Sequence, residues 1–114
     1  MDILLTGSSG FVGRHIAATL TKEHRVIAVN RRPTGTPGEI VHDFAQPLSS
    51  ARLPRRIDSV IHTAGLVGHQ ANSSPLCQRV NVDATKELAA YASKHGLANL
   101  CRLIFNSNEF MFVN

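Results

Sequence analysis

The segment that most constrains the fold of this chain is Thr-Gly-Ser-Ser-Gly-Phe-Val-Gly at residues 6–13, in which glycine recurs at every third position. The apolar residues 3–5 before it predict a short buried strand. The residues after it predict an amphipathic helix from about Gly10 to Lys22, because apolar or small side chains recur there at helical spacing. These side chains belong to Phe11, Ile16, Ala17 and Leu20. The pattern therefore predicts a strand that passes through a tight turn into a helix.

Each glycine of this segment has a predicted role in such a turn. Gly7 lets the chain turn sharply, Gly10 lets the backbone approach a pyrophosphate, and Gly13 lets the helix pack closely on the strand. The free N–H groups and the positive dipole end at the helix start would hold the anion. The strand before and the helix after supply the context that this motif requires. The alternative is a tight strand-to-helix turn that binds no ligand.

The rest of the chain continues to alternate strands and helices. One long helix is predicted from residue 75 to about 95, after a proline and before a glycine. Further strands are predicted at 25–30, 39–42, 59–63 and 103–105. This alternation implies a parallel sheet with helices on both faces and the strand order 3-2-1-4-5. We predict an α/β fold of the Rossmann type, a single domain over residues 1–114 that is truncated after its fifth strand, with a ligand at the carboxyl edge between strands one and four.

The composition narrows the possible classes of partner. The net charge is +4 at pH 7, but no basic run is long and the aromatic residues are not interleaved with basic ones. We therefore expect no nucleic-acid partner. No apolar stretch approaches the roughly 20 residues that span a bilayer, so we expect no membrane segment. Cys77 and Cys101 lack the spacing of metal ligands, and we expect free thiols in a reducing cytoplasm and no bound metal.

The pattern Thr-Gly-x-x-Gly-x-x-Gly directly after the first strand resembles that of the short-chain dehydrogenase/reductase family. The details are most similar to its extended branch, the nicotinamide-dependent epimerases, dehydratases and reductases of nucleotide-sugars. The resemblance implies a NAD(P)-binding domain and covers only the first part of the family's length. In the turn it implies cofactor contacts from Gly7, Ser9, Gly10, Phe11 and Val12.

Three later segments extend the resemblance. After the third strand, Asp43 would accept a hydrogen bond from the adenine amine and Phe44 would pack on the ring; alternatively, Asp43 is a turn or helix-capping residue. Asn81 on the long helix would support the sheet and the site through hydrogen bonds to the backbone, or it is a plain surface residue. At the end of the fourth strand, small residues would leave room for the cofactor ribose, and these are Thr63, Ala64 and Gly65.

The end of the second strand predicts which dinucleotide is preferred. An NAD-specific site usually places an acidic residue about 20 residues beyond the glycines, where it accepts a hydrogen bond from the ribose 2′-hydroxyl. Here Asn30, Arg31 and Arg32 take that place. Guanidinium groups pair with a 2′-phosphate, whereas a carboxylate would repel it. We therefore predict NADP in preference to NAD. The alternative is that both arginines are solvated loop residues.

Two residues with acid–base side chains are weaker candidates for catalysis. His62 has an ordinary pKa near neutrality, but its position inside a strand favours packing in the core or against the sheet. Tyr91 is followed by Lys94 only three residues later, whereas the family's catalytic pair has the spacing Tyr-x-x-x-Lys and lies further along the chain. We therefore interpret Tyr91 as a helix residue that packs on the sheet.

The carboxyl end departs from the family pattern. The resemblance places the catalytic Ser/Thr position at Asn108, with Ser107 one residue early, and the Tyr-x-x-x-Lys pair beyond the end of this sequence. A tyrosine with a nearby lysine carries the proton in this chemistry, so we expect cofactor binding without turnover at the family's rate. We expect the amino-terminal cofactor half of such an enzyme, truncated near Asn106. The alternative is a non-catalytic module that senses NADP(H), or that pairs with a second copy or a partner chain through its last strand.

Overall fold

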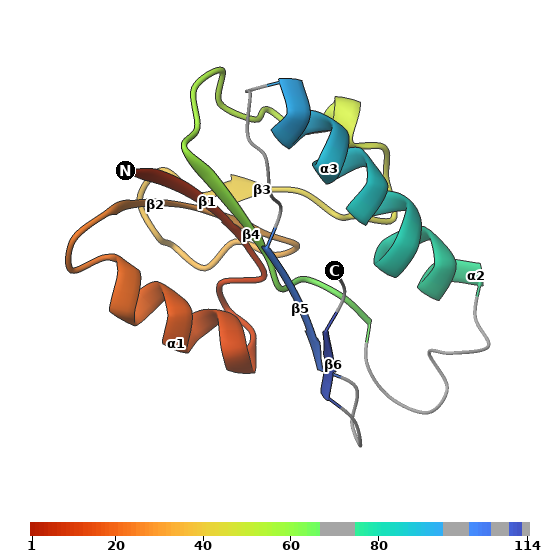
Figure 1. Cartoon of the computed structure of the whole chain (residues 1–114), viewed down its shortest axis with the longest axis horizontal. Coiled ribbons are helices and arrows are strands. Elements are labelled where there is room, and N and C mark those ends of the chain that lie inside the picture. The colour runs from red at the N-terminus through yellow and green to blue at the C-terminus, as the bar shows by residue number, and fades with distance from the viewer. Residues whose placement is uncertain (67–74, 95–100, 106–109, 113–114) are drawn as a thin grey trace.

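The computed structural model describes residues 1–66, 75–94, 101–105 and 110–112, the last two segments by their backbone (Figure 1). The strands are β1 (Asp2–Thr6), β2 (Arg25–Asn30), β3 (Ile40–Val41), β4 (Ser59–His62), β5 (Cys101–Phe105) and β6 (Phe110–Phe112). The helices are α1 (Phe11–Leu20), the 3₁₀ turn η1 (Leu48–Ser50), α2 (Pro75–Cys77), the π-helical segment η3 (Gln78–Asp83) and α3 (Ala84–Lys94).

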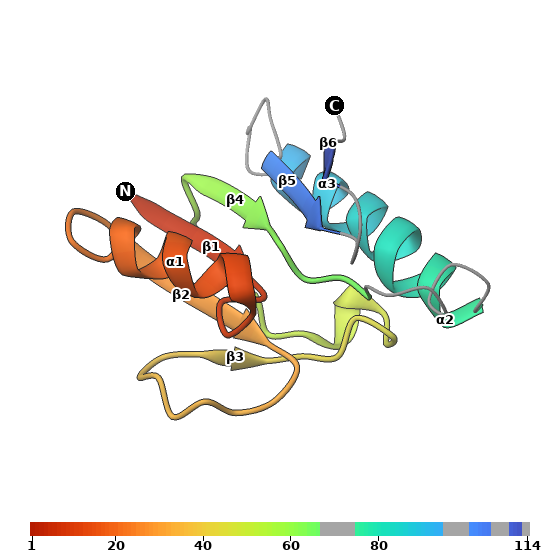
Figure 2. The same ribbon diagram turned by 90° about the horizontal axis from the view of Figure 1, so that it is seen from below.

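The scaffold of the molecule is a parallel sheet in the order β3-β2-β1-β4. Its centre is β1, in which Leu4 lies opposite Ile27 of β2 on one side and Val60 of β4 on the other. The arrows of these strands point the same way, so their carboxyl ends meet at one edge (Figure 2). This part of the predicted order is confirmed, and it brings the glycine-rich turn and the end of β4 together.

The sheet does not end in the way that the sequence predicts. The short segment β5 lies beside β4 over two residue pairs and runs parallel to it, and β6 then pairs antiparallel with β5. Residues 110–112 thus form a further strand on that side, which the sequence analysis did not predict. Three residues next to a polar stretch give too short a pattern to predict a strand.

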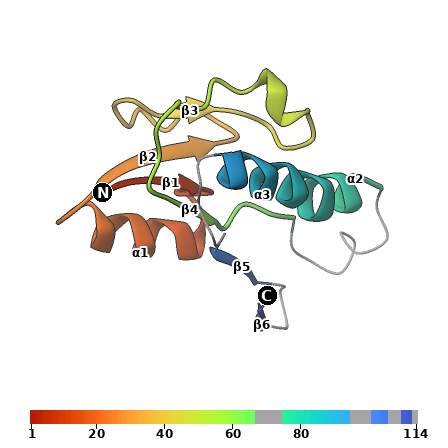
Figure 3. The ribbon, with the colours of Figure 1, turned by 45° about the horizontal axis from the view of Figure 1, so that its top comes forward.

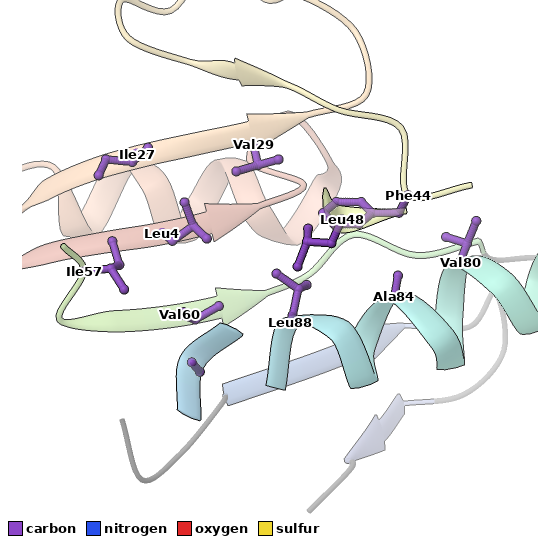
Figure 4. Close-up of a cluster of buried hydrophobic side chains, with 11 residues drawn as sticks. Leu4, Ile27, Val29, Phe44, Leu48, Ile57, Val60, Val80, Ala84 and Leu88 are labelled. Atoms are coloured by element: carbon purple, nitrogen blue, oxygen red, sulfur yellow. The ribbon is translucent and has the colours of Figure 1, made fainter. Parts of the chain in front are cut away.

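Buried side chains fill the space between the sheet and the second helical layer. Leu4, Val29 and Val60 point from the sheet toward Leu88 of α3 and Phe44 of the segment after β3 (Figure 4). The alternate β1 residues Ile3 and Leu5, which the two-residue period of a strand turns to the opposite face, are also buried. There α1 lies against β1 and β2, so helices cover both faces as predicted (Figure 3).

Two local features differ from the sequence-based expectations. The long helix is not regular, since η3 interrupts it between α2 and α3. Phe11 does not join the buried stripe of α1, because its side chain is 75% exposed and meets His15 edge to face, with the Arg14 guanidinium 5.4 Å from the ring centre. The first turn of α1 therefore holds its aromatic ring outside the core. Gly13 is the buried residue of this helix.

Candidate functional site

A cleft of about 460 Å³ lies at the carboxyl edge of the sheet, between the glycine-rich turn and the start of the long helix. This volume falls within the roughly 300–1,000 Å³ that is usual for small-molecule sites. The predicted site residues that line the cleft are Gly7, Ser9, Gly10, Arg31, Asp43, Phe44, Thr63, Ala64 and Gly65. The cleft thus gathers residues from four separate stretches of the sequence.

Apolar side chains that the sequence analysis did not single out complete the wall. Some of these residues stand next to a residue that the sequence analysis named, and the others lie on the long helix. From the sequence, only this placement could have indicated them. These residues are Val29, Ala45, Leu66, Leu76 and Val80. A mostly apolar wall with a few polar groups is the usual build of a ligand site.

The glycine-rich turn has the geometry that its sequence predicts. Gly7 has φ +70°, where side chains are strained, and a Cβ there would come within 2.8 Å of the Ala64 nitrogen. A Cβ on Gly13 would overlap the Gly7 carbonyl group and lie 2.7 Å from its carbon. Both positions therefore exclude any larger residue, and the start of α1 packs directly on the turn.

Gly10 is the position where the turn is open to the cleft. It caps α1 in an extended conformation, and no side chain caps the helix there. A Cβ on Gly10 would meet only the Gly7 carbonyl oxygen, at 3.3 Å, and otherwise open space. The first N–H groups of an α-helix have no partner within the helix. The residues present thus fit a diphosphate, which could approach these amides over a position that has no side chain.

The ends of β1 and β4 are joined by a compact network of hydroxyl and ring groups. The Thr63 hydroxyl donates to the Thr6 carbonyl at 2.6 Å, and the Thr6 hydroxyl lies 2.6 Å from Nδ1 of His62. His62 is fully buried and meets Phe44 edge to face. The interpretation of His62 as a packing residue is therefore confirmed, and its ring helps to fix the floor of the cleft.

Asn81 on η3 holds the loop that follows β4. Its side-chain oxygen accepts from the Leu66 N–H at 2.8 Å, and its amide nitrogen donates to the Leu66 carbonyl at 3.0 Å and lies 3.2 Å from Sγ of Cys77. Gly65 leaves room for this amide, because a Cβ there would lie 3.0 Å from its oxygen. Asn81 does not line the cleft itself, and it is not a plain surface residue.

Asp43 and Phe44 form the part of the cleft wall that follows β3. Oδ1 of Asp43 accepts from the Ala45 N–H at 2.9 Å, so this residue stabilises its own turn while it faces the cleft. Phe44 is mostly buried, with its ring edge to face against both His42 and His62. Burial lowers the pKa of His42 below its usual range, against the nearby Asp43 carboxylate, which acts in the other direction.

An arginine that the sequence analysis missed fixes this wall. Arg79 of η3 donates to the Ala45 carbonyl at 3.3 Å and to the Gln46 carbonyl at 2.7 Å, and it pairs with the Glu87 carboxylate. Glu87 in turn accepts from the Leu48 N–H at 2.6 Å. Burial raises the pKa of Glu87, but these hydrogen bonds and the guanidinium outweigh it and lower the pKa overall. Nothing in the sequence pattern indicates which loop Arg79 would reach.

The end of β2 is organised by Asn30, which is only 2% exposed. Its side-chain oxygen accepts from the Ser8 hydroxyl at 3.0 Å and the Ser9 N–H at 3.3 Å, so the amide ties β2 to the glycine-rich turn. Its nitrogen donates to the Glu39 carboxylate at 3.3 Å, a residue that the sequence analysis passed over. Arg31 lines the cleft, while Arg32 is exposed and does not.

The remaining residues that the sequence analysis discussed fall into three groups. Phe11, Val12 and Arg32 do not line the cleft, although the first two begin the helix that bounds it. Ser107 and Asn108 lie outside the described residues. Tyr91 lies elsewhere, where its hydroxyl donates to the Pro54 carbonyl at 2.8 Å and burial raises its pKa.

Metal and membrane sites can be assessed for the described part of the chain. Within residues 1–66 and 75–94, no three side chains of the metal-binding types gather closely enough to hold an ion. No helix in the described segments combines the length and the apolar character that crossing a membrane requires. Cys77 is a free thiol.

Comparison with known proteins identifies the family. The model of the NAD dependent epimerase/dehydratase family matches residues 3–111, nearly the whole sequence. The chain belongs to this family. Its cleft therefore lies in the NAD-binding Rossmann region that this epimerase/dehydratase family shares.

Individual relatives match over a small part of their own length. The chain is 32% identical to the hybrid PKS-NRPS synthetase fsa1 of Fusarium sp. (strain FN080326), over 86% of this chain and 3% of that protein. It is 30% identical to a 3-beta-hydroxysteroid dehydrogenase of Mycolicibacterium neoaurum, over 92% and 32% respectively. Among solved structures, MoeE5 in complex with UDP-glucuronic acid and NAD aligns with TM-score 0.73 and 32% identity, over 90% of this chain and 36% of MoeE5. The epimerase/dehydratase-family chain thus spans between 3% and 36% of the length of the relatives named here.

Proposed function

We propose that this chain binds a nicotinamide dinucleotide in the cleft at the carboxyl edge of its sheet. The observation that carries the proposal is the composition of the cleft, where the glycine-rich turn, the end of β2, the segment after β3 and the end of β4 meet. The family resemblance assigns cofactor contacts to three of these stretches, and the end of β2 is the usual place of the residue that meets the adenosine ribose. The NAD in the MoeE5 complex supports the same class of ligand.

Each part of the cofactor is contacted by a different group of residues. The amides at the start of α1 hold the diphosphate above Gly10, and Asp43 and Phe44 receive the adenine ring. Thr63, Ala64 and Gly65 leave space for the ribose, and Asn81 keeps their loop in place. The nicotinamide group, when bound, accepts or donates a hydride. The chain's own contribution is to bind and orient the dinucleotide.

For the choice of dinucleotide, we propose NADP in preference to NAD. Two features support this preference, because Asn30 provides no carboxylate at the end of β2 and Arg31 places a guanidinium at the cleft. NAD is the ligand of MoeE5, a relative that is 32% identical, and the titration below compares the two dinucleotides directly.

The complete reaction is proposed at the level of its class. A longer protein of which this chain is the cofactor half would act as an epimerase, dehydratase or reductase on a nucleotide-sugar or a similar hydroxyl or ketone substrate. The sequence given contains no Tyr-x-x-x-Lys pair, because its single tyrosine is Tyr91. We expect this chain to act in the cytoplasm and to bind its cofactor without turnover at the family's rate.

The test is a binding titration of the purified chain with NADPH and with NADH. We expect saturable binding of at least one dinucleotide with a Kd well below about 1 mM, which corresponds to about 4 kcal/mol. Gly10→Val, which fills the open position above the turn, should weaken binding at least tenfold. Ala18→Val on the exposed face of α1 is the matched control and should bind as the unmodified chain does. No saturable binding of either dinucleotide would overturn the proposal.

A second candidate function is a non-catalytic interaction module. The order of the sheet leaves β6 at its end, and an unpaired strand edge can recruit another strand. A homodimer or a complex with a partner chain would then form through this edge. Light scattering on the purified chain distinguishes the two, since a monomer across the micromolar range argues against pairing through the edge.

A further inference from the structure

The loop after β2 carries a carboxylate with four hydrogen-bond donors around it. Oε1 of Glu39 accepts from the Thr34 N–H at 2.7 Å and the Gly35 N–H at 3.0 Å. Oε2 accepts from the Thr34 hydroxyl at 2.6 Å and from the Asn30 amide at 3.3 Å. The carboxylate therefore uses both of its oxygens, and it ties residues 34–35 to the end of β2.

The donors around Glu39 form an arrangement that suits an anion. Thr34 and Gly35 are successive residues, and Gly35 has φ +84°. Consecutive backbone N–H groups that turn toward one point in this way form the concave sites in which proteins bind phosphates. The Thr34 hydroxyl is the main cause that lowers the pKa of Glu39, so the carboxylate stays ionised near neutral pH. The chain's own anion thus fills this position.

The location of Glu39 links it to the cleft. Its partner Asn30 stands where NAD-specific sites carry their acidic residue, and the other end of the same amide holds Ser8 and Ser9 of the glycine-rich turn. The next residue, Arg31, lines the cleft. Only the Asn30 side chain therefore separates the Glu39 carboxylate from the place expected for the adenosine ribose.

We propose that Glu39 is a specificity-determining residue, which weakens the binding of a dinucleotide that carries a 2′-phosphate. Its carboxylate repels the phosphate and occupies the backbone donors that a phosphate would otherwise use. It opposes Arg31, which attracts the same group, so the balance between these two residues sets the ratio of NADP to NAD affinity. This inference rests on the proposed dinucleotide site.

The experiment measures Kd for NADPH and NADH in the full chain and in two variants. Glu39→Gln removes the charge and keeps an oxygen that can accept from Thr34 and Gly35; Glu39→Ala also empties the site. We expect the ratio of NADPH to NADH affinity to rise about threefold in Glu39→Gln, the size of a typical exposed charge pair, and further in Glu39→Ala. Glu23→Gln, an exposed charge in the turn after α1, is the matched control and should leave the ratio unchanged.

The ratio separates specificity from a general loss of structure. A loosened loop weakens both dinucleotides together, whereas a lost charge changes their affinities relative to each other. A ratio within 1.5-fold of the unmodified chain's in both variants, roughly the scatter allowed by about 0.2 kcal/mol, would overturn the role of Glu39 and leave the dinucleotide site standing. An unmodified chain that binds neither dinucleotide would overturn both. Circular dichroism verifies that Glu39→Gln, the variant with the smaller structural change, is folded.

Discussion

The two walls of the cleft are built on different physical principles. The glycine-rich wall, residues 7–13, is held by backbone contacts so close that Gly7 and Gly13 have no room for a side chain. The second wall consists of residues 43–45 and 63–66 and meets the first where Gly7 packs on Ala64. Two side chains of η3 hold its segments across long sequence distances. Arg79 reaches the carbonyls of Ala45 and Gln46, and Asn81 reaches Leu66.

The comparison shows where rigidity comes from in a small site. Close backbone packing gives a wall that no side chain can adjust, while hydrogen bonds from two side chains give a wall that can be loosened one bond at a time. We therefore expect substitutions at Gly7 and Gly13 to act on folding as a whole. Substitutions in the second wall should act mainly on the loop that each side chain holds.

The largest expected effect is that of Gly13→Ala. Its Cβ would overlap the Gly7 carbonyl group, so either α1 or the turn must move, at a cost of about 3 kcal/mol in the free energy of unfolding. Gly38→Ala is the control, because Gly38 has φ +75° but open space around its Cβ position, and should cost about 1 kcal/mol. Chemical denaturation measures both. Equal costs would show that contact with Gly7 is unimportant.

Asn81→Ala should have the next largest effect. It removes both hydrogen bonds to Leu66 and leaves a part-buried N–H and carbonyl without their partner, at a cost of about 2 kcal/mol. Binding of the dinucleotide should weaken more than the loss of folded protein explains, because the loop at 63–66 lines the cleft. Asn81→Asp keeps the acceptor for the Leu66 N–H and should lose less stability. Denaturation and titration of both variants provide the measurement.

Arg79→Lys should cost less, about 1 kcal/mol. Lysine can keep the pairing with Glu87 but cannot hold two carbonyl oxygens with a planar fork, so the segment 45–46 loosens. The affinity for AMP, which would test the adenine end of the cleft, should fall along with stability. Tyr91→Phe, which loses one bond to Pro54 away from the cleft, is the control and should lower stability by a similar amount without changing AMP affinity.

The smallest expected effect is a dependence of stability on the protonation of His42. Burial holds its pKa below the unfolded value of 6.5, so the stability that the neutral ring contributes is present above that pH and is lost as the pH falls toward the folded pKa. His42→Gln should therefore lose less in Tm between about pH 7.5 and about pH 5.5 than the unmodified chain does. His15→Gln on the exposed face of α1 is the control and should keep the unmodified dependence. Identical slopes for all three proteins would contradict this role.

The predictable part of the molecule is the part that depends on local sequence. The runs 25–30 and 59–62 became β2 and β4 because β-branched and apolar residues favour a buried strand. The spacing of Gly7, Gly10 and Gly13 predicts the turn, since Gly10 and Gly13 meet Gly7 only a few residues away and Gly7 itself needs a positive φ. The residues that line the cleft could be predicted for the same reason, because most of them stand at the ends of these strands or in this turn.

The features that sequence reasoning missed depend on contacts between distant residues. In the sequence, Arg79 and Glu87 are ordinary helix residues. Their role comes from their contacts with the segment 45–48. Glu39 gains its role from a loop that folds back on it, and Asn30 gains its role from Ser8 and Ser9. Phe11 fits the helical period of α1, but it is the first residue of the helix and its side chain stays exposed.

The wider turn of η3 has a consequence for how this helix can change during evolution. Arg79 and Asn81 stand two residues apart and serve loops on either side of the helix, an arrangement that the local winding sustains. Deletion of Val80 would make Arg79 and Asn81 adjacent residues, which stand about 100° apart around a regular helix. One of the two loops would then lose its anchor even though every remaining residue type was unchanged, so the residue count of this turn is itself under constraint.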